Sequence, residues 1–428
     1  MNLLKVGIIG VGERGCYVLG SRLVELAKEL NIQITALCDI NERRIEDAKQ
    51  YLGARCKKQG LPWGDLIWGT TDFTQLVDHP QVNCVLITTH TDNHRQSAVY
   101  AIESGKLVYL DKPISVTMED AQAIVQTQAK AQRPVIMGFT RRYEASWRKA
   151  KELLDASVIG SLQMMQIHSI IPYTRYFQMW HRKTAWSGGA LNDKASHLLD
   201  VFRWMIGSNA TCRFVSAVGG KSEIFTPRND APYRCSECDL IDCAYRRNAN
   251  EHDDREGTHV LNQPSWKYAT QERDIADLCV YRPGSDIIDH AIATYQFENG
   301  VKASLLWAIY GPHAYDQETL ELIGSKGRIV LERETGNVTV HALGSKPNEE
   351  THTIYDTRGE YFNSSHYGAD IQLIKDIRSY FDGKSLDALG CAKVEDGIHS
   401  LAMVLATEQS VAQEGVPVFL KQETVHEY

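Results

Sequence analysis

The sequence predicts an α/β protein of two domains: a doubly wound parallel sheet at the N-terminus, followed by an α+β domain with a large, mainly antiparallel sheet. Over residues 1–140, short apolar runs alternate with segments of helical periodicity, which is typical of a parallel sheet covered on both faces. Over residues 141–428, strand-like segments follow one another and often alternate apolar with polar residues. A polar stretch at about 221–280 interrupts this second pattern, and we expect it to be a long insertion.

The first domain opens with a nucleotide-binding unit. Residues 5–10 form a strand candidate rich in β-branched side chains, and Gly10, Gly12 and Gly15 follow at G-x-G-x-x-G spacing before a helical pattern over residues 16–30. In such a unit the glycines supply a tight turn, close approach of the backbone to a pyrophosphate, and helix–strand packing. The helix N-terminus directs its N–H groups at the phosphates. This order of elements predicts a Rossmann-type dinucleotide site.

Asp39 bears on which dinucleotide is bound. A second apolar run, residues 32–37, leads to this acid, which stands roughly 20 residues beyond the glycines, where a carboxylate accepts from a ribose 2′-hydroxyl. A carboxylate there repels a 2′-phosphate, so the predicted cofactor is NAD. Arg43 and Arg44 lie close enough in sequence to leave NADP as an alternative, although their usual place is the outer face of the next helix.

The remaining elements continue the two patterns. In the first domain we expect strands at 84–88, 107–110 and 135–139, and helices at 43–52, 94–104 and 117–132. In the second domain the strand candidates are 162–170, 214–219, 292–297, 301–308, 319–323 and 328–331, with helices at 367–381 and 394–414. Asn299-Gly300 lies between two of these strands and predicts a tight hairpin turn.

Composition restricts the class of partner. The chain has 428 residues, of which 43% are hydrophobic and 23% charged, as in an ordinary globular protein of two domains. Its formal net charge is -8 and no basic stripe stands out, so nucleic acid is not an expected partner. Neither a signal peptide nor a run of 18 apolar residues is evident, so we expect no membrane span and a cytoplasmic location.

A cysteine cluster falls within the expected insertion. Ten cysteines in a chain of this length do not suggest a disulfide scaffold, but Cys235, Cys238 and Cys243 have C-x2-C-x4-C spacing. Such spacing in a polar segment suggests a structural zinc site, for which Cys279 is the first choice of fourth ligand and His252 and His259 are rivals. The alternative is a set of reduced thiols without metal.

Further motifs follow the glycines in a recognisable order. They are Thr88-Thr89 with His94 downstream, Asp111-Lys112-Pro113, Gly138-Phe-Thr-Arg-Arg-Tyr143 and Gly188-Gly-Ala-Leu-Asn-Asp-Lys-Ala-Ser-His197. Over nearly its whole length the chain therefore resembles the Gfo/Idh/MocA oxidoreductases, the group containing glucose–fructose oxidoreductase and inositol dehydrogenases. The resemblance implies a Rossmann domain, an antiparallel α/β domain that often makes homo-oligomer contacts, and hydride transfer with a nicotinamide cofactor.

The same resemblance assigns residues to the cofactor and marks two departures. Thr88, Thr89, His94 and Lys112 are implied to join the glycines and Asp39 in cofactor binding. Asp111 stands where the family usually has Glu, and His90 stands where it usually has Pro, which could reshape the nicotinamide edge of the site.

Three residues are candidates for the chemistry. Oxidation of an alcohol needs a hydride acceptor and a base for the hydroxyl proton, held in close geometry. Lys112 follows a strand of the parallel sheet, at the end where ligands bind, and its ammonium could bond the reacting hydroxyl; the alternative is a solvated loop lysine. Asp193 and His197 lie four apart in a helix expected at 192–205, so they share one face. The resemblance implies that His197 accepts the proton and that Asp193 binds substrate or orients the imidazole; the alternatives are a capping Asp and a buried structural His.

Substrate contacts are expected from residues near these motifs. Arg142 and Tyr143 follow a strand end and could reach substrate hydroxyls, with an interdomain salt bridge or packing as the alternative. Tyr176 and Trp186 belong to an aromatic-rich stretch whose ring faces suit the apolar side of a sugar, although core packing is the commoner use of such rings.

These residues lead to one functional hypothesis and two alternatives. The first is an NAD-dependent dehydrogenase that acts on a sugar or cyclic polyol. The second, within the same family, is a glycosidase that retains NAD and works by transient oxidation and elimination. The third is a non-catalytic sensor that binds NAD, which the presence of Lys112, Asp193 and His197 argues against.

Overall fold

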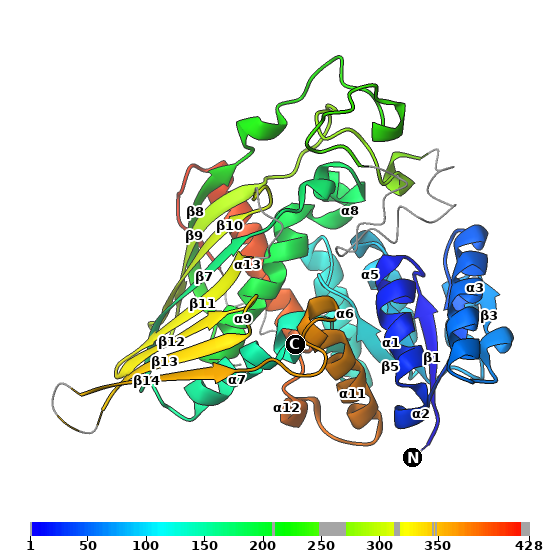
Figure 1. Ribbon diagram of the computed structural model, residues 1–428, viewed down its shortest axis with the longest axis horizontal. Coiled ribbons are helices and arrows are strands. Elements are labelled where there is room, and N and C mark those ends of the chain that lie inside the picture. The colour runs from blue at the N-terminus through cyan, green and yellow to red at the C-terminus, as the bar shows by residue number, and fades with distance from the viewer. Residues whose placement is uncertain are drawn as a thin grey trace.

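The computed structural model describes residues 2–207, 210–247, 271–311, 317–344, 346 and 349–420. The described residues form two separate sheets, and helices pack against each sheet (Figure 1). None of the helices in the described part of the chain is long and apolar enough to cross a membrane.

The first sheet is parallel throughout, as predicted. Its strands are β1 (Leu4–Ile9), β2 (Ile32–Cys38), β3 (Trp68–Thr70), β4 (Cys84–Ile87), β5 (Leu107–Leu110) and β6 (Ile136–Met137), in the order β3-β2-β1-β4-β5-β6. The chain moves outward in one direction from β1 and then returns to the other side at β4. The crevice between β1 and β4 is the place where an open sheet of this kind binds its ligand.

Helices cover both faces of this sheet. They are η1 (Glu13–Gly20), α1 (Ser21–Glu25), α2 (Ala27–Leu30), α3 (Glu42–Lys58), α4 (Phe73–Asp78), α5 (His94–Glu103) and α6 (Met118–Ala131), with short turns η2 (Gly64–Leu66), η3 (Thr91–Asn93) and η4 (Thr140–Tyr143). Asn41 and Thr117 cap α3 and α6 by accepting backbone N–H groups, as residues of these types do at helix starts. The helix predicted over 16–30 is interrupted: a wide-turned π-helix, η1, comes first, and two short α-helices follow it.

In the part of the chain that the structure describes, the second sheet has nine strands and is mainly antiparallel, as predicted. They are β7 (Leu162–Ile170), β8 (Cys212–Gly220), β9 (His290–Phe297), β10 (Lys302–Ala308), β11 (Gln317–Gly324), β12 (Gly327–Glu332), β13 (Asn337–Leu343), β14 (Glu350–Asp356) and β15 (Val418–Phe419). Among the strands in the described residues of this sheet, only β7 and β10 pair in parallel. Gly300 adopts a φ of 88° in the turn between β9 and β10, where the sequence predicts a hairpin.

The sheet has one buried face and one outer face. Along β9 the burial of side chains alternates, which places every second residue in the core. Met164, Val218 and Ile292 are about half exposed, so the sheet carries apolar side chains outside its core. The oligomeric state of the chain stays a prediction.

The helices of the second half of the chain pack against both sheets. They are α7 (Ala145–Asp155), α8 (Thr184–Ser187), the π-helix η7 (Leu191–Ala195), α9 (Ser196–Ile206), α11 (Ala369–Phe381), α12 (Leu386–Leu389) and α13 (Val394–Ala412), with short turns η5 (Thr174–Phe177), η6 (Trp180–Arg182) and η11 (Ser365–Gly368). Ile371, Ile374 and Ile377 of α11 belong to the same apolar cluster as β1, so this helix covers the first sheet. Figure 1 shows α11 and α12 between the two sheets.

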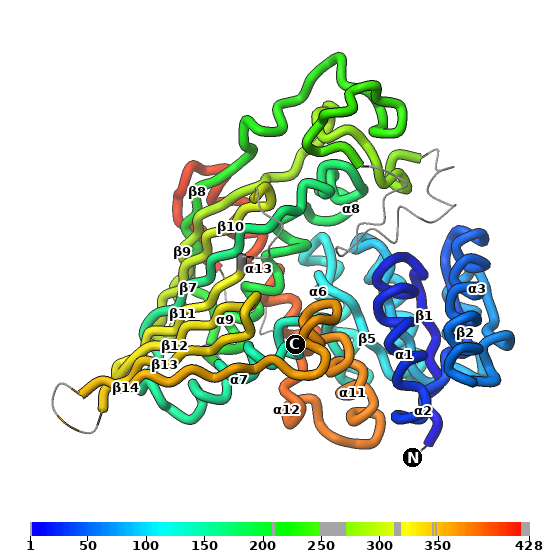
Figure 2. The backbone as a smooth tube through the Cα atoms, viewed as in Figure 1, coloured from blue at the N-terminus to red at the C-terminus, as the bar shows by residue number. Residues whose placement is uncertain are grey.

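The predicted insertion contains little regular secondary structure in its described residues 221–247 and 271–280. Its regular structure there consists of the short turns η8 (Glu223–Phe225), η9 (Cys235–Glu237) and η10 (Glu272–Asp274), together with one isolated bridge between Arg234 and Leu278. Figure 2 shows the green insertion extending from the large sheet across to the side of the first domain.

Candidate active site

The three glycines do three different things at the end of β1. Gly10 has a φ of 88°, and a Cβ there would lie 2.7 Å from the carbonyl of Thr88. A Cβ at Gly15 would lie 2.1 Å from the carbonyl oxygen of Gly10, so this glycine allows the helix to pack against the strand. A Cβ at Gly12 would meet nothing within 4 Å, and Gly12 lines the large cleft. Gly12 is therefore the position at which a ligand has room to approach the backbone.

Asp39 lies beside this loop. It follows β2, is 8% exposed, and accepts the N–H of Val11 at Oδ2 and of Asn41 at Oδ1, both at 3.1 Å. Burial raises the pKa of the Asp39 carboxyl, although Arg44 and the two N–H groups oppose that rise. The carboxylate is thus fixed beside the glycine loop, at the position predicted for the ribose contact.

Thr88, Thr89 and His94 form the neighbouring turn. The Thr88 hydroxyl donates to the carbonyl of Gly10 at 2.7 Å. One ring nitrogen of His94 lies 2.9 Å from the carbonyl oxygen of Pro113 and the other lies 3.2 Å from that of Thr89, so the imidazole joins two loops. Thr88 and Thr89 line the cleft, whereas His94 is buried behind it. His94 therefore shapes the site from behind the cleft wall.

Lys112 lies after β5 and reaches the second domain. Its ammonium donates to Asp193 Oδ1 at 2.9 Å and to the Asp193 carbonyl oxygen at 2.8 Å. The hydroxyl of Tyr176 donates to the other carboxylate oxygen, and the ring of His181 stacks on that of Tyr176 at 4.4 Å. Burial opposes ionisation of Asp193, but Lys112, His181 and the hydrogen bonds outweigh it and lower its pKa well below the usual range. Asp193 is thus a fixed anion that orients the lysine.

His197 lies one turn further along the same helical segment. Its side chain is 5% exposed, lines the cleft and packs edge-on against Phe139, with 6.0 Å between ring centroids. Burial lowers the pKa of His197 well below 6.5, and the cations Lys112 and Arg141 lower it further. Its Nδ1 is buried and has no hydrogen-bond partner among the described residues. The imidazole is therefore neutral at physiological pH and able to accept a proton.

One cleft is lined by all of the predicted cofactor-binding and catalytic residues except Gly15 and His94. Its volume is about 2120 Å³, and its wall includes Gly12, Asp39, Lys112, Asp193 and His197. Pockets for drug-sized ligands are typically about 300–1,000 Å³. The cleft therefore has room for a dinucleotide and a second small molecule together.

Three of the four expected substrate residues are placed elsewhere. Arg142 is buried and donates to both carboxylate oxygens of Asp200 at 2.9 and 2.6 Å, which is the salt-bridge alternative rather than a substrate contact. Tyr143 is buried in the apolar cluster of the first sheet. Trp186 does not line the cleft, and the guanidinium of Arg273 lies 5.8 Å from its ring centroid. Tyr176 alone of the four faces the cleft.

The predicted zinc site is not supported. Within the described ranges, no group of three or more His, Cys, Asp or Glu side chains could hold a metal ion. Cys235, Cys238, Cys243 and Cys279 do line one small cavity, of about 20 Å³, but their thiols are free and serve there as small packing groups. The rival ligands His252 and His259 lie outside the described residues.

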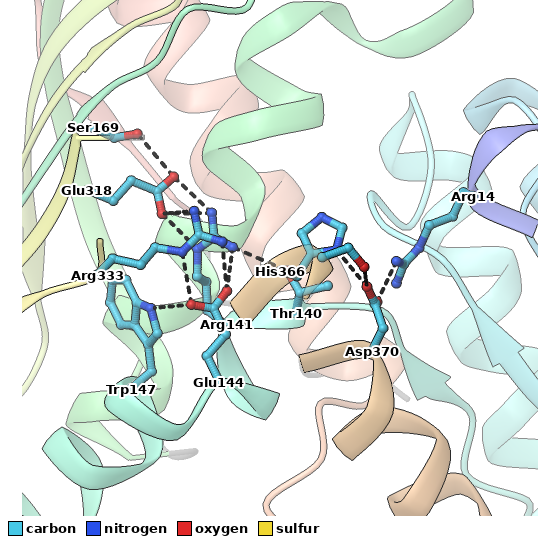
Figure 3. Close-up of polar contacts among 11 residues, drawn as sticks. Arg14, Thr140, Arg141, Glu144, Trp147, Ser169, Glu318, Arg333, His366 and Asp370 are labelled. Carbon is cyan, nitrogen blue, oxygen red and sulfur yellow. Dashed lines mark hydrogen bonds and ion pairs between the residues drawn. The ribbon is translucent and has the colours of Figure 1, made fainter. Parts of the chain in front are cut away.

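A charged network behind the glycine loop was not expected from the sequence. Arg14, between the second and third glycines, pairs with Asp370 at 2.5 Å (Figure 3) and with Asp111 at 3.2 Å. Asp370 Oδ2 in turn lies 2.8 Å from Nδ1 of His366, a residue of the cleft wall with a φ of 50°. The place of Arg14 inside the glycine motif is a signal that could have been used, whereas its partner is 356 residues away.

A second network lies under the large sheet, beside the site. Arg141 and Arg333 are each 2% exposed and together bond Glu144 and Glu318, forming a neutral quartet of two cations and two anions (Figure 3). Arg141 is also one of the cations that lower the pKa of His197. The quartet therefore holds the segments that carry these four residues together, and through Arg141 it contributes to the electrostatic potential at His197.

The fold and the cleft define a two-domain α/β protein with a dinucleotide-type site between its domains. Residues 4–139 match a domain described as "Oxidoreductase family, NAD-binding Rossmann fold", and residues 151–420 match "Oxidoreductase family, C-terminal alpha/beta domain". Both belong to the Gfo/Idh/MocA group, and the chain is therefore a member of the Gfo/Idh/MocA oxidoreductase family.

Individual relatives agree with this membership. The chain is 32% identical over 204 residues to "Inositol 2-dehydrogenase 3" of Saccharopolyspora erythraea, an alignment that spans 47% of this chain and 54% of that protein. It is 24% identical over 411 residues to "Putative oxidoreductase YteT" of Bacillus subtilis, which covers 91% of this chain and 92% of that protein. The match to the inositol dehydrogenase thus spans about half the length of that relative.

Solved structures share the fold. A levoglucosan dehydrogenase in complex with NADH and levoglucosan superposes with a TM-score of 0.74 at 17% identity, over 98% of this chain and 100% of that chain. An oxidoreductase domain protein from Kribbella flavida gives the same TM-score and identity over 99% of this chain. At this level of identity the likeness shows the fold alone.

Proposed function

We propose that this protein is an NAD-dependent dehydrogenase that oxidises a hydroxyl group of a sugar or cyclic polyol. One observation carries the proposal: Lys112 from the first domain and His197 from the second line the same cleft as the glycine loop. The side chains that alcohol oxidation requires, a cation for the reacting oxygen and a neutral base, are thus contributed by separate domains to one space.

The nucleotide site fits an NAD molecule on its own features. Gly12 leaves open space where a pyrophosphate would lie, and Asp39 presents a fixed carboxylate for a ribose hydroxyl. When bound, NAD would supply a hydride acceptor. Every other part of the chemistry falls to side chains of this chain.

Each of those side chains would have a separate role. The Lys112 ammonium, held by Asp193, would donate a hydrogen bond to the substrate hydroxyl and favour its ionisation. His197, being neutral, would accept the hydroxyl proton while the carbon gives up its hydride. Asp193 and Tyr176 would hold the lysine in place, because both of the carboxylate oxygens are already bonded.

The substrate class rests on the cleft wall and on the relatives. Tyr173, Tyr176 and Trp180 give the cleft an aromatic wall, in which the rings of Tyr176 and Trp180 are held in place by stacking with His181 and His90. Relatives named inositol 2-dehydrogenase and a structural neighbour named levoglucosan dehydrogenase point to polyols and sugars. Both observations favour a ring-shaped polyhydroxyl substrate.

A His197→Asn variant tests the proposal. A panel of sugars and inositols with NAD should give NADH with the wild-type protein, and the variant should lose about 10²- to 10⁴-fold in kcat, the usual contribution of a general base. NADH affinity, followed by fluorescence, should change little, and His341→Asn on strand β13, a residue that does not line the cleft, serves as control. Wild-type turnover by His197→Asn would refute the assigned base, and release of an aglycone without net NADH would move the reaction to the glycosidase class.

A further inference from the structure

The insertion of the second domain reaches the nucleotide site of the first. Arg273, in the short turn η10, donates to Nδ1 of His90 at 2.8 Å and to Asp92 at 2.9 Å, and both partners lie after β4 of the first sheet. The ring of His90 also stacks on that of Trp180, with 4.4 Å between centroids. Residues 271 and 273–276 line the cleft. This segment is therefore anchored across the cleft by a bidentate charged contact.

The next residue, Asp274, meets Arg44. Arg44 lies in the first turn of α3, five positions after Asp39, and its guanidinium is 3.3 Å from Asp274 and 3.9 Å from Asp39. Its side chain is 18% exposed, and that of Asp274 is 28% exposed. The guanidinium is thus shared between two carboxylates that come from different domains. Asp274 is also close enough to Asp39 to raise the pKa of that carboxyl, an effect secondary to burial.

The position of Arg44 decides what the ribose side of the site can accept. An acid after the second strand accepts from a 2′-hydroxyl, whereas an arginine nearby can accommodate a 2′-phosphate. Both residue types are present here, so Asp39 alone does not settle the choice. A 2′-phosphate would meet two carboxylates and would have to displace Asp274 from the guanidinium.

We propose that Asp274 is a specificity-determining residue of the nucleotide site: it holds the Arg44 guanidinium and adds a second negative charge, which together exclude nucleotides bearing a 2′-phosphate. The inference rests on the proposed function, since it concerns the cofactor of the same site. It assigns to the insertion a direct part in cofactor selection.

An Asp274→Asn variant tests this assignment, because it keeps the side-chain size and removes the charge. We expect its Kd for NADPH, measured by fluorescence titration of the full chain, to fall by about fivefold or more, while the Kd for NADH changes less than about twofold. Adding Arg44→Met should abolish the gain, since the cation that would bind the phosphate is then absent. Asp242→Asn, an exposed aspartate of the same insertion that does not line the cleft, is the matched control.

The outcomes separate this inference from the proposed function. Unchanged NADPH affinity in Asp274→Asn, with NADH binding intact, would refute the role of Asp274 and leave the dehydrogenase proposal standing. Equal loss of both nucleotides would also refute it, because Asp274 would then only hold the segment in place. A wild-type chain that binds neither nucleotide would overturn the proposed function itself.

Discussion

Removing one cation from the buried quartet under the large sheet should destabilise the protein strongly. Arg333 donates to Glu144 at 2.9 and 3.0 Å and lies 3.6 Å from Glu318, while Arg141 bonds both carboxylates from the other side. Arg333→Met keeps apolar volume but leaves one net negative charge where the side chains are 1–2% exposed. Breaking a buried ion pair costs about 3–5 kcal/mol. Since Arg141 still bonds both anions, we expect a loss of about 3 kcal/mol, at the lower end of that range.

Urea-induced unfolding, followed by tryptophan fluorescence and circular dichroism, measures this loss. Adding Glu144→Gln to Arg333→Met restores neutrality, so the double variant should recover at least about 1 kcal/mol of the stability lost by the single one. Arg358→Met is the matched control, because Arg358 pairs with Asp356 on the surface, where both side chains are more than half exposed. A loss below about 1 kcal/mol for Arg333→Met, or a double variant no better than the single, would refute the reasoning.

Two further predictions concern the nucleotide loop and pH. Gly12→Val should fold normally, because a Cβ there meets nothing within 4 Å, yet it should weaken NADH binding by about 100-fold or more in fluorescence titration. Gly10→Ala should instead lower the unfolding free energy by at least about 1 kcal/mol, because Gly10 has a φ of 88° and a Cβ there would lie 2.7 Å from a carbonyl. The opposite pattern would contradict the assigned roles. Burial lowers the pKa of His197 well below 6.5, so this imidazole should lower stability by up to about 1.4 kcal/mol per pH unit as pH falls below 6.5. Because the raised pKa values of Asp200 and Glu408 act in the opposite direction, the test is the difference in unfolding free energy between wild type and His197→Asn: it should fall from pH 7 to pH 5, and a difference that stays level or rises would contradict this.

Sequence patterns predicted the parts of the molecule that local chemistry determines. The alternation of apolar runs and helices identified the parallel sheet, and β-strand alternation identified the antiparallel one. Gly10, Gly12, Asp39 and Lys112 line the cleft as expected, because their positions are fixed by the ends of strands in a doubly wound sheet, while their binding roles stay predictions. Helical spacing placed Asp193 and His197 together, and both face the cleft.

Other features depend on partners that local patterns do not reveal. The sequence offered no means to pair Arg142 with Asp200, 58 residues away, or Arg44 with Asp274, 230 residues away. The π-helical turns at Glu13–Gly20 and Leu191–Ala195 were missed as well, because one extra residue per turn is invisible in an apolar repeat of 3.6. Both turns contribute residues to the cleft, in keeping with the frequent occurrence of such turns at functional sites.

Helix α13 has a consequence for how the chain unfolds. Val394, Ile398 and Leu401, in its first half, pack in a cluster with the parallel sheet, whereas Met403 and Val404, further along, pack in the core of the antiparallel one. Because α13 packs in both hydrophobic cores, the unfolding of one core removes apolar contacts from the other. Loss of order in either half exposes apolar surface of the other, so we expect the two halves to unfold together, and an excised N-terminal fragment would carry a sheet with part of its cover missing.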